Sequence, residues 1–245
     1  MKEHFSNTQA NEFLARYPKV LPGANETNTG FQATVFQDLK GQLTLAIRGT
    51  QTEEWKDLVA DGQIVMNGMA YDQILSMYNW WQRVSHAQGT SVLQYRLKNN
   101  ALVSSKISAT GELAAALAQD PDRKIDVTGH SLGGHLAMAF GALFAKSTGQ
   151  VTAFNAPGFK STSQSAGISN VAFFKTLGGA MPTGVNTVNV IADEASIGKA
   201  PWSAIAGLHN RPGEWVNLSI EDQSNEPLIS SLTATLITKI HSQMV

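Results

Sequence analysis

The chain has 245 residues, of which 42% are hydrophobic and 15% are charged, and its formal net charge is −1. This length can bury a full core, and because no linker or internal repeat interrupts the chain we predict a single domain over residues 1–245. The near-neutral charge leaves no electrostatic footprint for nucleic acid or an anionic membrane surface, and the lack of cysteine excludes disulfides, thiolate catalysis and cysteine-ligated metals.

Helices and strands are predicted to alternate along the chain. In chain order we predict a helix at 8–17, hairpin strands at 31–36 and 43–47, helices at 53–60, from 71 and at 112–119, a strand at 123–128, a helix at 135–145, strands at 151–154 and 187–191 separated by a loop at 160–169, and a last helix at 228–240. This alternation predicts an α/β fold with a mainly parallel central sheet, helices on both faces, and antiparallel strands added by the hairpin.

No targeting or membrane-spanning segment is predicted. The first ten residues lack the apolar region of a signal peptide, and no apolar run approaches 18 residues. We therefore expect a soluble protein that is cytoplasmic or exported by a route independent of a signal peptide.

The most informative motif is G-H-S-L-G-G at residues 129–134. It places Ser131 between glycines at the point where a predicted strand turns into a predicted helix, which is typical of a nucleophile elbow. The glycines permit a strained turn, and the helix N-terminus favours an oxyanion beside the serine. The alternative interpretation is a glycine-softened turn without chemistry.

A serine nucleophile needs a histidine base and a carboxylate that orients it. Asp193 directly follows the strand predicted at 187–191, although it could instead cap a helix, and Glu194 is the fallback acid. Two histidines follow this acid, His209 and His241. We favour His241 as the base because 48 residues separate it from Asp193, enough for another layer of structure, and His209 stays the alternative.

The oxyanion hole needs at least two donors. The backbone N–H of Leu132, directly after the nucleophile, is one candidate. Thr50 is the second, because it ends a strand that we predict to neighbour the elbow. Thr50 could also cap the next helix, and the two roles are compatible.

Two apolar stretches are candidates for the acyl site. Residues 65–81 contain Met69 and the pair Trp80-Trp81, while residues 167–181 contain Phe173-Phe174. The regular spacing in the first stretch is equally typical of a fixed core helix. We predict that the first stretch lines or covers the acyl site, because its methionines and aromatic rings offer an adaptable apolar surface.

Three segments together resemble the class 3 lipases of the fungal triacylglycerol lipase type: A-I-R-G-T at 46–50, W-K-D-L at 55–58 and V-T-G-H-S-L-G-G at 127–134. Residues 57–73 and 154–159 look more like the bacterial branch of that family. The resemblance covers roughly residues 31–241. It implies an α/β-hydrolase fold, hydrolysis of carboxylic esters of lipids, Ser131 as nucleophile, Asp193 as acid, a late histidine as base, and Thr50 in the oxyanion hole.

The neighbourhood of His241 is similar to that of the family's histidine, but the family continues well beyond it, so we expect a domain truncated shortly after the base. The predicted function is a serine carboxylester hydrolase that acts on lipid or acyl esters through an acyl-enzyme. The alternatives are a phospholipase A1 or thioesterase with the same machinery, or a catalytically silent lipid-binding module. We expect no cofactor, metal or nucleic acid partner, and transient contact with a lipid interface is compatible with this function.

Overall fold

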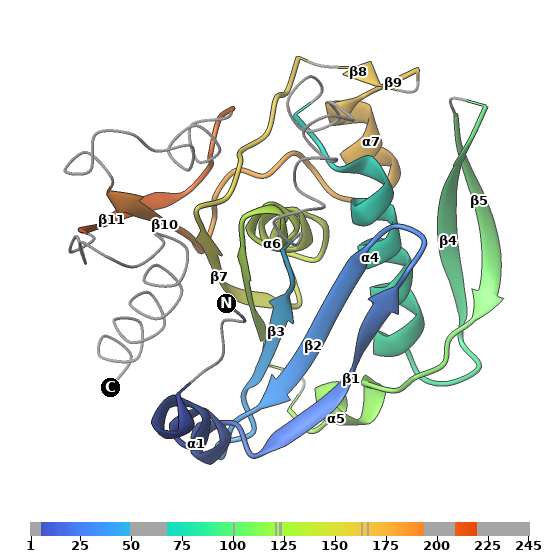
Figure 1. Ribbon diagram of the computed structural model, residues 1–245. Coiled ribbons are helices and arrows are strands. Elements are labelled where there is room, and N and C mark those ends of the chain that lie inside the picture. The colour runs from blue at the N-terminus through green and yellow to red at the C-terminus, as the bar shows by residue number, and fades with distance from the viewer. Residues whose placement is uncertain are drawn as a thin grey trace.

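The computed structural model describes residues 6–49, 68–99, 101–120, 122, 124–162, 164–165, 167–193 and 209–219. Its centre is a seven-stranded sheet in the order β1-β2-β3-β6-β7-β10-β11 (Figure 1). The strands are β1 (Lys19–Glu26), β2 (Phe31–Gln37), β3 (Leu43–Ile47), β6 (Ile125–His130), β7 (Thr148–Phe154), β10 (Thr187–Asp193) and β11 (Glu214–Ser219). From β3 to β11 all neighbours are parallel, and β1 and β2 add antiparallel pairs at one edge. The predicted mainly parallel sheet with its hairpin is confirmed.

Helices lie on both faces of this sheet. The described helices are α1 (Asn7–Arg16), α4 (Tyr71–Ser85), α5 (Ala114–Ala118), α6 (Leu132–Leu143) and α7 (Asn170–Thr176). Helices α4 and α6 pack on the face to which Phe31 points, since its ring lies 6.0 Å from Trp80 of α4. Helix α1 packs on the opposite face, where Phe13 meets Phe36 of β2 edge-on at 5.1 Å.

Several boundaries differ from the prediction. The helix expected at 112–119 is shortened to α5, and the loop expected at 160–169 ends in a small hairpin of β8 (Gln164–Ser165) and β9 (Ile168–Ser169). Strands β1 and β11 were not predicted. The helices expected at 53–60 and 228–240 lie outside the described residues.

Helix α4 is a core helix. Its apolar stripe is buried between the sheet and α6, where the ring of Trp81 meets Phe140 edge-on at 4.9 Å. The amphipathic spacing of the sequence produces this burial, because one helical face carries the large side chains. The interpretation of residues 71–81 as core is therefore right.

A second sheet was not predicted at all. Strands β4 (Ser91–Lys98) and β5 (Ala101–Ser108) form an antiparallel hairpin beside α4 (Figure 1). Asn79 of α4 hydrogen-bonds the edge of β4 that is not paired with β5. Its Nδ2 donates to the Tyr95 carbonyl at 2.7 Å, and its Oδ1 accepts from the Tyr95 N–H at 2.8 Å. The side chains of β5 are almost all exposed.

Across the described part of the chain, none of the helices combines the length and the apolar character that crossing a membrane requires.

Candidate active site

Ser131 occupies a strained turn between β6 and α6. Its backbone has φ +55° and ψ −123°, a conformation that costs a non-glycine residue about 1–3 kcal/mol. The turn is held because the Ser131 N–H donates to the Phe154 carbonyl at 2.8 Å and the Ser131 carbonyl accepts from the N–H groups of Gly134 and His135. The hydroxyl makes no capping bond to the helix, although serine at this position usually does. The predicted elbow is thus present, and its hydroxyl is not used for capping.

The three glycines of the motif are required by close packing. A Cβ on Gly129 would lie 2.3 Å from the backbone of Gly133, and one on Gly134 would lie 2.7 Å from the Cβ of Ala156. A Cβ on Gly133 would lie 2.3 Å from the carbonyl oxygen of Ile47 in β3. Strand, helix and neighbouring strand therefore approach each other at the elbow without room for a methyl group.

Replacing Gly133 with alanine is expected to lower the free energy of unfolding by about 2–3 kcal/mol, because the new methyl group meets backbone that cannot rotate away. Gly141→Ala in the same helix is the matched control, since its Cβ would lie 2.8 Å from a methyl group of Val151 and 3.8 Å from one of Thr148, which are side-chain atoms and can shift more easily than backbone. Urea unfolding measures both variants. Equal losses for the two would contradict the packing argument.

The chain directly after β3 lies against the elbow. A Cβ on Gly49 would lie 2.5 Å from the His130 carbonyl oxygen and 3.7 Å from the Cβ of Ser131. Thr50 is the next residue, and it lies outside the described residues. Leu132 is the first residue of α6, and N–H groups in the first turn of a helix have no acceptor within the helix. The oxyanion role of the Leu132 N–H stays a prediction.

Asp193 is the last residue of β10 and ends at the same edge of the sheet as Ser131. Strand β7 lies between β6 and β10, and the Asn155 N–H donates to the Val190 carbonyl at 2.9 Å just after the end of β7. Two strand spacings amount to about 10 Å. The backbone thus places the predicted acid two strands away from the predicted nucleophile, at the same edge of the sheet.

His135, one helical turn after Ser131, is buried, and its sequence context predicts no role for it. Its side chain is 0% exposed, and its ring stacks on Phe159 at 4.0 Å. Nδ1 lies 3.2 Å from the Pro157 carbonyl oxygen and donates to it, so Nε2 is left to accept from the Ala70 N–H at 3.4 Å. Burial lowers the pKa of His135 to about 4, which keeps the ring neutral.

This neutral ring predicts a loss of stability in acid. Between about pH 6.5 and pH 4 the unfolded chain binds a proton at His135 that the folded chain does not bind, so the free energy of unfolding falls by about 3 kcal/mol over that range. Urea unfolding at pH 7 and pH 4.5 should show a smaller fall in His135→Gln than in the parent protein. Equal falls in both would show that another group dominates.

Of the two candidate bases, the structure describes only His209. His209 precedes β11 in the left-handed region at φ +63°, and the next residue, Asn210, pairs with Phe159 through two backbone hydrogen bonds. His209 is near enough to His135 that the interaction of the two rings helps to lower the pKa of His135. His241 lies outside the described residues. Both assignments stay predictions.

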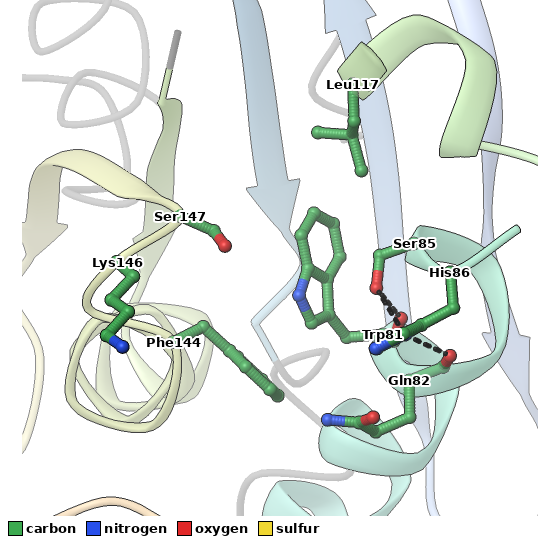
Figure 2. A pocket seen from close by; sticks show the side chains of 8 residues that line it. All are labelled: Trp81, Gln82, Ser85, His86, Leu117, Phe144, Lys146 and Ser147. Carbon is green, nitrogen blue, oxygen red and sulfur yellow. Dashed lines mark hydrogen bonds between the residues drawn. The ribbon is translucent and has the colours of Figure 1, made fainter. Parts of the chain in front are cut away.

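The predicted acyl site does not fit the observed burial. Met69 is 0% exposed and Trp81 is 3% exposed, and Phe173 and Phe174 of the alternative stretch are fully buried as well. Trp81 instead lines a cavity of about 310 Å³ at the C-terminal ends of α4 and α6, opposite the elbow (Figure 2). The other lining residues are Gln82, Ser85, His86, Leu117, Phe144, Lys146 and Ser147. The prediction that residues 65–81 line the acyl site is therefore wrong for residues 68–81, the part that the structure describes, because their large apolar side chains fill the core.

Comparisons with known proteins agree with the motif. The family described as Lipase (class 3) matches residues 44–190, more than half of the chain. No curated protein matches.

Similar solved structures include a triacylglycerol lipase from Penicillium expansum, at 15% identity and a TM-score of 0.40, covering 89% of this chain and 77% of that one. A nonglycosylated Lip2 lipase from Yarrowia lipolytica matches at 16% identity and a TM-score of 0.43, covering 94% and 75%. A second Yarrowia lipolytica Lip2 structure has 16% identity and a TM-score of 0.38, covering 94% and 84%.

The family match spans the sheet from β3 to β10 and includes the elbow. Membership of the bacterial branch stays a prediction. The chain belongs to the class 3 lipases, and it is a carboxylic ester hydrolase with lipid esters as substrates.

Proposed function

We propose that this protein hydrolyses lipid or acyl esters through a Ser131–His241–Asp193 triad and an acyl-enzyme. The Ser131 oxygen attacks the ester carbonyl while His241 takes the hydroxyl proton, and Asp193 orients the imidazole. The N–H of Leu132 and a donor from Thr50 hold the oxyanion. The alcohol leaves with the proton from His241, and water then releases the acid in a second attack of the same kind.

The backbone of Ser131 carries this proposal. Hydrogen bonds to β7 and within α6 hold Ser131 at φ +55°, and the three glycines let the neighbouring backbone pack closely around it. An ordinary surface turn can form without such backbone strain. The strain raises the hydroxyl out of the backbone at the N-terminus of α6, where a developing negative charge is stabilised. This arrangement supports a nucleophile more than a structural turn.

Covalent labelling tests the proposal. A fluorophosphonate forms a stable phosphonyl ester with an activated serine, so mass spectrometry should find the modification on the peptide that contains Ser131. The label should be absent in Ser131→Ala and present in Ser91→Ala, which removes an exposed hydroxyl at the start of β4.

The same experiment separates the rival functions. A folded protein that takes up no label at Ser131 would support a silent lipid-binding module instead of an enzyme with this nucleophile. Labelling at Ser131 leaves phospholipase A1 and thioesterase chemistry as variants of one mechanism, because the shape of the substrate pocket, and not the triad, distinguishes them. Initial rates on a triacylglycerol, a phospholipid and a thioester then rank the three.

A further inference from the structure

The near-neutral charge of the whole chain conceals a local cluster of cations. The β4–β5 hairpin, residues 91–108, carries Arg96, Lys98 and Lys106 and no Asp or Glu, so its charge is +3 while that of the chain is −1. All three side chains are exposed, and among the described residues none of them forms an ion pair. A charge of one sign, left unpaired on a projecting hairpin, is expected to attract a surface of the opposite sign.

The same hairpin also exposes three large apolar side chains to solvent. Leu93 is 39% exposed, and Val103 and Ile107 are each 38% exposed. Val103 lies opposite Arg96 in the strand register, so an aliphatic group and a cation stand side by side on one face. Aliphatic groups next to cations are the combination that binds the boundary between headgroups and acyl chains of an anionic lipid layer.

The hairpin points toward the same end of the molecule as the elbow. Tyr95 of β4 is level with Asn79 of α4, and Lys98 lies three residues, about 10 Å, farther along. That advance equals about seven residues of a helix, so the tip is level with the first turn of α4. The residue before this turn, Ala70, donates to His135 beside Ser131. In Figure 1 the tip between β4 and β5 points in the same direction as the end of β3.

We infer that the β4–β5 hairpin is a docking surface for anionic lipid layers and that it holds the edge of the sheet with Ser131 toward the lipid. Arg96 and Lys98 share one face of the hairpin with Val103 and Ile107, and they contact lipid phosphates while those two aliphatic side chains enter the headgroup region. Lys106 lies opposite Leu93 on the other face and adds to the attraction through its charge. The exposed edge of β5 carries Lys106, and a lysine on an edge strand opposes pairing with another protein strand. The inference rests on the lipid-ester substrate of the family and does not depend on the identity of the triad.

Binding to vesicles tests the inference with the full chain. The probe is a vesicle of phosphatidylcholine with roughly one-third phosphatidylglycerol, compared with pure phosphatidylcholine in a co-sedimentation assay. The triple variant Arg96→Gln, Lys98→Gln and Lys106→Gln should bind the anionic vesicles about a hundredfold more weakly, since each cation near such a surface contributes about fivefold. Val103→Ser with Ile107→Ser should weaken binding to both vesicles.

A charge-matched control uses cations at the other end of the sheet. Lys40 precedes β3, Lys124 precedes β6, and Lys146 follows α6, and all three are exposed. Their triple change to Gln should alter vesicle binding less than about threefold. Equal binding by the two triple variants would overturn the inference, and so would a dimer in solution that the Val103 and Ile107 changes dissociate without any effect on vesicle binding.

Hydrolysis of a water-soluble short ester separates this inference from the proposed function. The hairpin variants should keep that activity, because none of the changed residues contacts the elbow, and should lose activity on the anionic vesicles. A parent protein that binds vesicles and hydrolyses no ester would contradict the triad and leave the docking surface supported. A parent protein that hydrolyses the soluble ester and does not bind anionic vesicles would overturn the docking surface alone.

Discussion

Ser131→Ala is expected to lower ester hydrolysis by about ten-thousandfold or more, because the proposed acyl-enzyme forms on the Ser131 oxygen. The fold should persist, since the hydroxyl makes no capping bond and alanine meets the same backbone strain as serine at φ +55°. Initial rates on p-nitrophenyl butyrate measure the loss, and urea unfolding checks the fold.

Ser91→Ala, which removes an exposed hydroxyl, is the control for this change and should keep the parent rate. A stably folded Ser131→Ala protein that retains more than a few per cent, approximately, of the parent turnover would contradict the assignment of the nucleophile.

His241→Ala is expected to cost nearly as much activity as the loss of the serine, because members of one triad act as a unit. His209→Ala should keep most of the activity. His209 is the alternative base to exclude, because it lies near His135 of α6. The residue after it, Asn210, pairs with Phe159. Rates on the same ester, with urea unfolding as the check on folding, decide between them.

An inactive His209→Ala together with an active His241→Ala would reassign the base to the segment before β11. Loss of both activities with intact folding would mean that one histidine is the base and the other positions it. The pH dependence of kcat/KM would then be measured in the variant that keeps more activity. That variant retains the base, and the loss of the positioning histidine should shift the pKa of this base.

Features that local sequence determines were predicted well. The parallel strands, the first hairpin and the elbow depend on β-branched runs, turn residues and glycines that lie within a few positions of each other. Strand β1 escaped prediction because Pro22 and Gly23 interrupt its pattern at an irregularity in the register between Leu21 and Ala24. The β4–β5 hairpin was not predicted because hydrogen bonds from Asn79 of α4 hold the free edge of β4, and no local sequence pattern reveals a contact with another element.

The candidate site divides in the same way. Ser131 and Leu132 could be placed from the motif, and the strand order puts Asp193 at their edge of the sheet. The role of His135 could not be predicted, because its burial depends on Phe159 and Ala70, which lie far from it in sequence. The acyl-site prediction failed for the same reason, since periodicity alone does not distinguish a core helix from a pocket wall.

The pairing of β3 with β6 has a consequence for how the protein is made. Thr44 faces Asp126 across this pair, so closing the contact that presses on the elbow requires ordering a loop of about 80 residues. Contacts of such long range form late in folding and slow it. During synthesis the serine turn cannot be compressed until β6 and α6 have left the ribosome, and the acid at the end of β10 arrives later still. Nascent chains should therefore pair β1 to β3 before the elbow and the end of β10 come together.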